Sequence, residues 1–179
     1  MEDSKFMRTI RGESWRDDLA ANSIIYLHDC HEINCLALSD KIQVCSRCSK
    51  TKGGTQQGKP KDFYVGCINL KFYSWCEARN ISYAILSDKY GLYLQDEVKD
   101  WYDVHPSSLQ DEDFKKLGKL IRDKMKSIKK WGFLFYNTSP VMSNPYFKMM
   151  MYAGGPIYFI TSLPDIPTRT MKGLGLLDK

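Results

Sequence analysis

The stretch K-I-Q-V-C-S-R-C-S-K-T-K-G-G-T-Q-Q-G-K-P-K-D-F-Y-V-G-C, residues 41–67, carries the clearest structural pattern of the chain. A short apolar run with Ile42, Val44 and Cys45 ends at the polar residues 48–52, and a glycine-rich loop follows. This pattern predicts a buried strand that leads into a polar loop. In an open α/β sheet, ligands bind beyond the carboxyl ends of the strands, so the loop is a candidate site. The alternative is that its glycines form only a mobile surface loop.

Three further apolar runs predict buried strands at residues 83–86, 131–136 and 157–160. Between the strands we expect helices at residues 69–79, from Ser108 or Asp111 through Lys130, and at residues 144–152. Strands that alternate with helices predict an α/β fold, because each parallel connection requires a crossover. The expected architecture is a single three-layer domain with a mainly parallel sheet of four or slightly more strands and with helices on its faces.

The two ends of the chain differ from this regular region. Residues 1–40 are predicted to form an N-terminal extension, in which the apolar runs 23–27 and 33–38 indicate a hairpin or two edge strands. Residues 41–162 form the predicted α/β domain, and residues 163–179 an irregular C-terminal tail.

Composition limits the class of protein. At 179 residues the chain is long enough for one self-sufficient core. A run of about 18 apolar residues is absent and the N-terminus is charged, so we expect no membrane association and a cytoplasmic location. In that location, the six cysteines of the chain are expected to be reduced. The formal net charge of +5 permits a polyanionic partner without requiring one.

Polar residues directly after the predicted strands are the candidates for chemistry. Cys48 follows the first strand beside several cations, and nearby cations increase the fraction of a thiol that is ionised and nucleophilic. Lys50 and Lys52 are suited to hold a phosphate, although no Walker motif is present. The remaining ionisable groups in loops after the strands are Asp62, Tyr64, Asp88, Lys89 and Asp103. If these loops converge, a carboxylate beside a lysine is a plausible acid/base pair, and if they do not, it is a surface ion pair.

Two other patterns have both a functional and an ordinary interpretation. Cys30, Cys35, Cys45 and Cys48 have spacings similar to a zinc site, but buried cysteines that act as small apolar residues are the preferred interpretation, and no cofactor is favoured. The cations of the expected helix before Lys130 are suited to contact a phosphate backbone, or they are simply its solvated face.

Several short motifs together resemble those of an uncharacterised family of small α/β domains found in bacteria, archaea and phages. The motifs are C-S-K-T-K at residues 48–52, K-D-F-Y at residues 61–64, L-S-D-K-Y-G-L at residues 86–92 and Y-D at residues 102–103. The resemblance covers residues 42–160. The family has a small residue where this chain has Asp88, an aliphatic one at Phe63 and proline at Trp101. These departures alter the shape of the expected pocket.

More distantly, the chain looks similar to the YaaA family and to the lysine-transferring archaeosine synthase domain, both associated with nucleic acids. The resemblance implies an enzyme that acts on a nucleobase or nucleoside, within RNA or DNA, by glycosylase-like or group-transfer chemistry, with a nucleic acid or nucleotide as its partner. The expected site comprises the catalytic residues Cys48, Asp62, Tyr64 and Lys89 and the substrate-binding residues Ser49, Lys50, Lys52, Ser87, Tyr90 and Asp103. The alternatives are a non-catalytic nucleic-acid-binding or stress-response protein and a zinc-stabilised interaction module.

Overall fold

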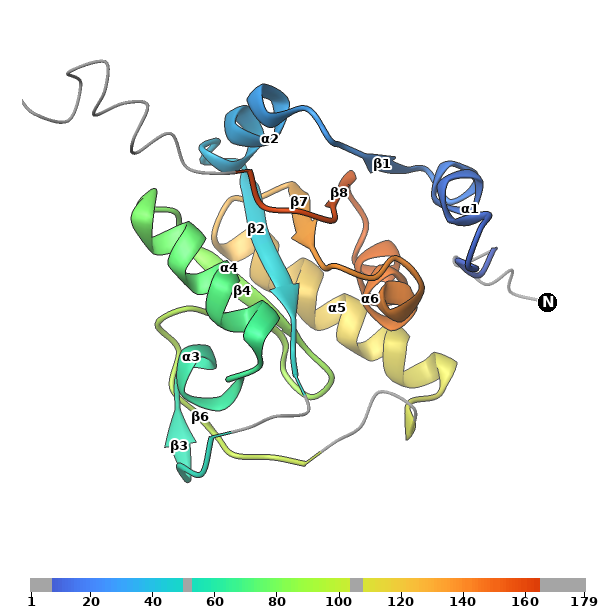
Figure 1. The fold of residues 1–179 in the computed structure, drawn as a ribbon. Coiled ribbons are helices and arrows are strands. Elements are labelled where there is room, and N and C mark those ends of the chain that lie inside the picture. Colours follow the sequence, from blue (N-terminus) through green and yellow to red (C-terminus); the bar gives the residue numbers. More distant parts are fainter. Residues whose placement is uncertain (1–7, 50–52, 104–107, 165–179) are drawn as a thin grey trace, which may run out of the picture.

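The computed structural model describes residues 8–49, 53–103 and 108–164, and Figure 1 shows how their helices and strands are arranged. In chain order the elements are α1 (Trp15–Ala21), β1 (Ile24–Tyr26), α2 (Cys30–Ala37), β2 (Ile42–Arg47), β3 (Gln57–Gly58), α3 (Pro60–Phe63), α4 (Cys67–Ala78), β4 (Tyr83–Ser87), β5 (Gly91–Leu94), β6 (Lys99–Asp100), α5 (Asp111–Ser127), β7 (Gly132–Tyr136), η2 (Val141–Ser143), α6 (Asn144–Ala153) and β8 (Ile157–Ile160).

The main sheet has six strands in the order β1-β8-β7-β2-β4-β5. All neighbours are parallel except β4 and β5, which pair antiparallel. Within the sheet, Val44 of β2 lies opposite Tyr83 of β4 on one side and Leu134 of β7 on the other. The prediction of an α/β fold with a mainly parallel sheet is therefore confirmed.

The central strands are buried on both faces. Every residue of β4 and of β7 is buried, and in β2 only Arg47 is partly exposed. Strands covered on both faces have continuous apolar runs instead of an alternating pattern, which is why β4 and β7 could be recognised in the sequence. Strand β2 differs, because it also buries the polar Gln43 and Ser46.

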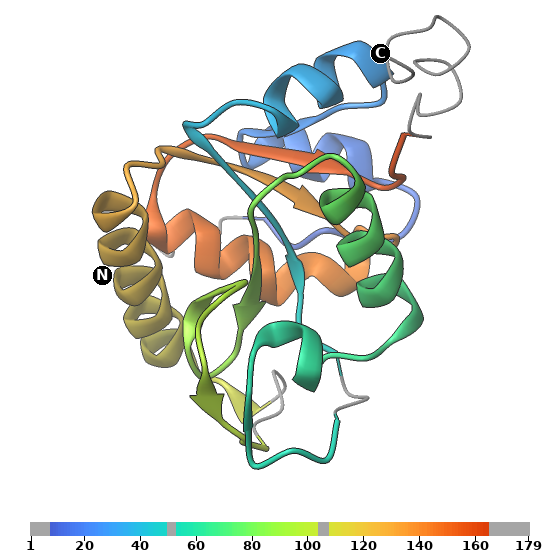
Figure 2. The same ribbon diagram turned by 90° about the vertical axis from the view of Figure 1, so that its left-hand side faces the viewer.

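Helices cover both faces of the sheet. Figure 2 shows α4 (green) on one side of the strands and α5 (olive) and α6 (orange) on the other. Right-handed crossovers explain this division, because the chain moves across the sheet in one direction from β2 to β4 and in the opposite direction from β4 to β7. The sheet order thus reverses between β2 and β7, and a reversal of this kind is where open α/β sheets bind ligands.

The N-terminal region differs from the prediction. β1 pairs with β8 and so forms an edge strand of the main sheet, whereas the second apolar run folds as helix α2, so the predicted hairpin is wrong. The Asp29 side chain accepts the backbone N–H of Glu32 at 2.9 Å and caps α2, and Ile33 and Ala37, four residues apart, are both buried. The helix cap and the helical spacing of the buried residues therefore favour a helix more strongly than the β-branched Ile33 favours a strand.

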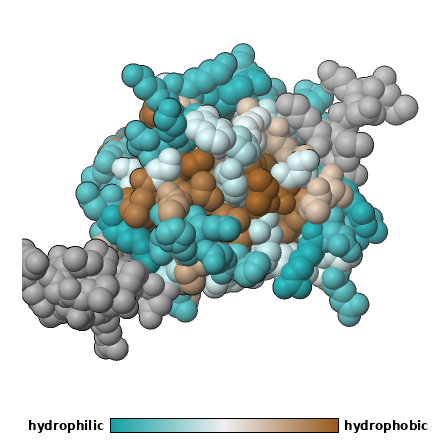
Figure 3. All heavy atoms as spheres, turned by 90° about the horizontal axis from the view of Figure 1, so that it is seen from above, coloured by the Kyte–Doolittle hydropathy of each residue, from teal (hydrophilic) through white to brown (hydrophobic). Residues whose placement is uncertain are grey.

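The surface around β1 and α2 exposes large apolar side chains. The face seen from above in Figure 3 has apolar side chains among polar ones, and Ile25 and Leu38 are among the large apolar residues exposed in the β1 and α2 region.

Among the residues that the structure describes, no helix is long and apolar enough to cross a membrane. Of the predicted C-terminal tail, residues 165–179 lie outside the described residues.

Close packing of α5 against α6 depends on Gly118. A Cβ atom at this position would lie 2.4 Å from the Cβ atom of Tyr152 and 2.8 Å from its carbonyl carbon. We expect Gly118→Ala to lower the free energy of unfolding by about 1–3 kcal/mol, because α6 must move. Helix propensity alone would favour alanine by about 1 kcal/mol, so a more stable variant in urea denaturation would contradict the packing. Gly12→Ala, where no heavy atom lies within 4 Å of the added Cβ, is the control.

Candidate functional site

The carboxyl ends of three adjacent strands are held together by hydrogen bonds. The backbone N–H of Cys48, just after β2, donates to the carbonyl of Leu86 in β4 at 3.1 Å. The Arg47 Nε donates to the Asn137 Oδ1, just after β7, at 3.0 Å. The first polar residues after β2, β4 and β7 therefore lie at one edge of the sheet, where the strand order reverses.

The Cys48 thiol lies inside this edge of the molecule. Its side chain is buried, and its Sγ lies 3.3 Å from the Tyr146 Oη, with which it forms a hydrogen bond. Tyr146 belongs to α6, which follows β7 in the chain. The contact thus joins the end of β2 to the helix on the other side of the reversal.

A chain of hydroxyl groups lies beside the thiol. The Ser87 Oγ accepts the backbone N–H groups of Lys89 at 3.1 Å and of Tyr90 at 3.0 Å. A hydroxyl oxygen has two acceptor sites, so the Ser87 O–H itself donates to the Tyr102 Oη, 2.8 Å away. The Tyr102 hydroxyl is in turn hydrogen bonded to the Tyr64 hydroxyl. The two backbone N–H groups therefore orient the Ser87 hydroxyl toward Tyr102.

The phenols of this cluster are uncharged at neutral pH. Burial raises the pKa of Tyr64, Tyr102 and Tyr146 above the ordinary value of tyrosine, and the charged forms of Cys48 and Asp88 raise each pKa further. A phenol with a raised pKa keeps its proton and can donate it in a hydrogen bond. We refer to Cys48, Tyr64, Ser87, Asp88, Tyr102 and Tyr146 as the strand-end cluster.

Helix α4 supports the cluster from one face of the sheet. The buried Asn69 donates through Nδ2 to the carbonyl of Arg47 at 2.7 Å, and the Tyr73 hydroxyl donates to the carbonyl of Tyr64 at 2.8 Å. A Cβ atom at Gly66 would lie 3.3 Å from the Cβ atom of Ser49. The start of α4 thus fixes the backbone on both sides of Cys48.

The structure brings together some of the predicted site residues. Cys48, Tyr64 and Ser87 belong to the strand-end cluster, and the buried Ser49 directly follows Cys48. Lys50 and Lys52 lie outside the described residues.

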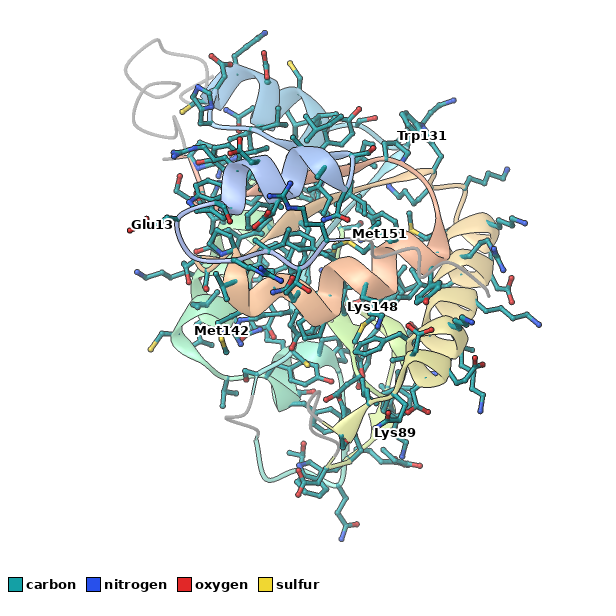
Figure 4. The ribbon with its side chains drawn as sticks, turned by 90° about the vertical axis from the view of Figure 1, so that its right-hand side faces the viewer. Glu13, Lys89, Trp131, Met142, Lys148 and Met151 are labelled. Carbon is teal, nitrogen blue, oxygen red and sulfur yellow. The ribbon has the colours of Figure 1, made fainter. Side chains whose placement is uncertain are left out.

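Other predicted site residues have different surroundings. The exposed Asp62 accepts the backbone N–H of Lys59 through Oδ2 at 2.8 Å and so caps α3. Lys89 is on the surface (Figure 4), with its Nζ 5.4 Å from the ring centre of Tyr90 and 5.8 Å from that of Tyr102, so it borders the strand-end cluster. The Tyr90 hydroxyl donates to the carbonyl of Asp100 at 2.7 Å, and Asp103 is exposed.

Three residues of the cluster, Asp88, Tyr102 and Tyr146, were not among the predicted site residues, although Asp88 belongs to the ionisable groups expected in loops after the strands. Tyr102 stands in the quoted Y-D motif, but only the structure shows its hydroxyl between Ser87 and Tyr64. Tyr146 lies in an apolar helix, where an aromatic residue usually indicates core packing. Its contact with Cys48 joins residues 98 positions apart, and a single sequence contains no signal for such a contact.

The four cysteines of the predicted zinc set are not gathered. Cys30 and Cys35 are exposed on α2, whereas Cys45 is fully buried within β2, where burial raises its pKa and opposes the thiolate form that binds metals. Cys35 Sγ lies 3.6 Å from the His31 Nε2. Within residues 8–49, 53–103 and 108–164, no group of three or more His, Cys, Asp or Glu side chains could hold a metal ion.

A hollow of about 410 Å³ lies at the same end of the molecule, lined by Gly53, Gly54, Thr55, Gln56 and Trp101. The Trp101 ring is 43% exposed, and its backbone N–H donates to the carbonyl of Gln56 at 2.8 Å. Figure 1 shows β3, α3 and β6 beyond the carboxyl end of β2. The hollow and the strand-end cluster are therefore adjacent in the chain, since Trp101 lines the hollow and the next residue, Tyr102, belongs to the cluster.

No family model matches the chain, and comparisons with curated proteins and with solved structures find no match. The chemistry of the site therefore has to be inferred from its own residues.

We expect Tyr102→Phe to lower the free energy of unfolding by about 1–3 kcal/mol, because Ser87 and Tyr64 each lose a buried hydrogen-bond partner. Tyr90→Phe is the matched control. It removes the same atom from a hydrogen bond at the surface, and we expect a change of no more than about 0.5 kcal/mol in urea denaturation. Equal effects of the two substitutions would contradict the buried hydroxyl chain.

Proposed function

We propose that this protein is an enzyme that acts on a nucleobase or nucleoside, within RNA or DNA, by glycosylase-like or group-transfer chemistry, with Cys48 as the nucleophile. The observation that supports this most is the contact of 3.3 Å between the Cys48 Sγ and the Tyr146 Oη at the carboxyl ends of β2 and β7. The Tyr146 hydroxyl keeps its proton, so it holds the thiol in position and does not act as its base.

The cluster is suited to a reaction in which negative charge develops. In the proposed step the Cys48 sulfur forms a bond to an electron-poor carbon of the base or sugar. The electron pair displaced from that carbon moves to a leaving atom or to a heteroatom of the ring. Neutral phenols such as Tyr64 and Tyr146 supply O–H groups that can hydrogen bond to the atom that gains charge, and donors that are already in place are effective in a site that excludes water.

The hollow beside Trp101 is a reason to propose a flat, aromatic substrate. An exposed indole ring offers a stacking surface, and base stacking on an aromatic side chain contributes about 1–3 kcal/mol per base. A base must leave its own stack before an enzyme can react with it, so a surface that replaces the lost stacking is needed. Lys50 and Lys52 hold the phosphate in this proposal on the grounds of the sequence alone.

A second candidate function is binding of nucleic acid without catalysis. Lys116, Lys119, Arg122, Lys126 and Lys129 are exposed on α5 and directly after it. By contrast, Lys115 and Lys124 of the same helix form ion pairs with Glu112 and Glu97. This candidate predicts binding that weakens steeply with salt and leaves the nucleosides unaltered.

Mass spectrometry of nucleosides tests the enzymatic proposal. Cells that express the wild-type protein are expected to contain an altered nucleoside, or a released base, that is absent from cells expressing Cys48→Ala. Cys67→Ala removes an exposed thiol from the start of α4 and is expected to behave like the wild type. If the digests of RNA and DNA are the same with wild-type protein and with Cys48→Ala, the proposed activity is wrong.

A further inference from the structure

Two aspartates are buried among the described residues, Asp18 and Asp88. The Asp18 carboxylate has an evident structural role, because it forms an ion pair with Arg8 at 2.6 Å and accepts the backbone N–H of Arg11 and the hydroxyl of Ser14, each at 2.9 Å. Asp88 lies directly after β4, and only 4% of it is exposed. Asp88 belongs to the strand-end cluster and supplies its carboxylate.

Backbone geometry places Asp88 near Cys48. The carbonyl of Leu86, two residues before Asp88, accepts the backbone N–H of Cys48, so the chain at the end of β4 is directly beside the chain at the end of β2. Ser87, the intervening residue, bonds to Tyr102. The charges of Cys48 and Asp88 act on the same three phenols, those of Tyr64, Tyr102 and Tyr146.

The charged side chains of Asp62 and Lys89, which were expected to act as acid or base, are exposed. The Asp62 carboxylate faces the backbone of Lys59, and Lys89 is exposed. Within the strand-end cluster, the phenols keep their protons because burial raises their pKa. A carboxylate is a common general base in enzymes, and Asp88 is the carboxylate of this cluster.

We propose that Asp88 is the general base of the site, which accepts the proton of the Cys48 thiol while the sulfur attacks its substrate. This inference rests on the proposed nucleophilic role of Cys48. In the step, the S–H bond breaks and its proton passes to a carboxylate oxygen of Asp88, while the sulfur electron pair forms the new S–C bond.

A purely electrostatic role for Asp88 has the opposite consequence. A negative charge near a thiol disfavours the thiolate, so neutralising the carboxylate would then make Cys48 more reactive. General-base catalysis instead predicts that the neutral variant reacts more slowly. The direction of the change therefore distinguishes the two roles.

Alkylation by iodoacetamide measures this direction without any nucleobase. In this reaction the sulfur forms a bond to carbon, iodide leaves with its electron pair, and the thiol proton goes to the base. The protein carries Cys30→Ser, Cys35→Ser and Cys67→Ser, which remove the exposed thiols, and mass spectrometry follows the rate at Cys48 at pH 7. We expect Asp88→Asn to slow the reaction at least about tenfold, since general bases typically contribute about 10²–10⁴-fold.

Asp123→Asn is the matched control and is expected to change the rate by less than about twofold, because Asp123 is exposed on α5, outside the cluster. A rate that is unchanged or raised in Asp88→Asn would overturn the proposal.

If Asp88→Asn fails to fold, the wild-type reaction in D₂O decides instead. A slower reaction in D₂O is expected when a proton moves during the attack, and a reaction that is equally fast or faster would contradict the role. Since no nucleobase is present, a positive result here with unaltered nucleosides in cells would refute the proposed substrate and not the role of Asp88.

Discussion

The parallel pairing of β2 with both β4 and β7 is the constraint on which the site depends. Because parallel strands end at the same edge of a sheet, the residues that follow them are gathered whether or not they are near in sequence. Cys48 and Asn137 directly follow β2 and β7, and Ser87 is the last residue of β4. Hydrogen bonds of Cys48 and Asn137 to the neighbouring strand ends hold these ends in register, and Ser87 is hydrogen bonded to Tyr102. A change in the strand order would separate these groups.

Burial determines what this edge of the sheet can do chemically. The phenols of Tyr64, Tyr102 and Tyr146 are removed from water, which keeps them uncharged and strengthens their hydrogen bonds to a developing charge. Two backbone N–H groups orient the Ser87 hydroxyl toward Tyr102, so this donor needs little reorganisation during a reaction. Arg47 and Asn137 hold the ends of β2 and β7 together at the reversal of the strand order.

Those parts of the fold with a local signal could be predicted from the sequence. The strands β4, β7 and β8 are short continuous apolar runs, and Ser87 follows the run of β4. Strand β2 has a shorter apolar run with Ile42, Val44 and Cys45, and Cys48 directly follows this strand. Helix α2 was predicted as a strand because its apolar run is short, and the cap at Asp29 was not weighed. The contact of Tyr146 with Cys48 could not be predicted, because it depends on how α6 packs after β7. Asp62 resembled a site residue in its motif, but the structure gives it a local role as a cap.

Tyrosine ionisation tests the central claim most directly, since the strand-end cluster requires shielded and neutral phenols. Protein labelled with ¹³C at the tyrosine ζ carbons would be titrated by NMR, with Tyr64→Phe, Tyr102→Phe and Tyr146→Phe used to assign the signals. An exposed tyrosine ionises near pH 10, whereas these three have a raised pKa in the folded state and are expected to stay protonated above that pH until the protein unfolds. The unfolded chain then loses protons more readily than the folded one, so stability should fall as the pH rises above about 10. Ionisation of the three phenols near pH 10, with the fold intact, would contradict the account.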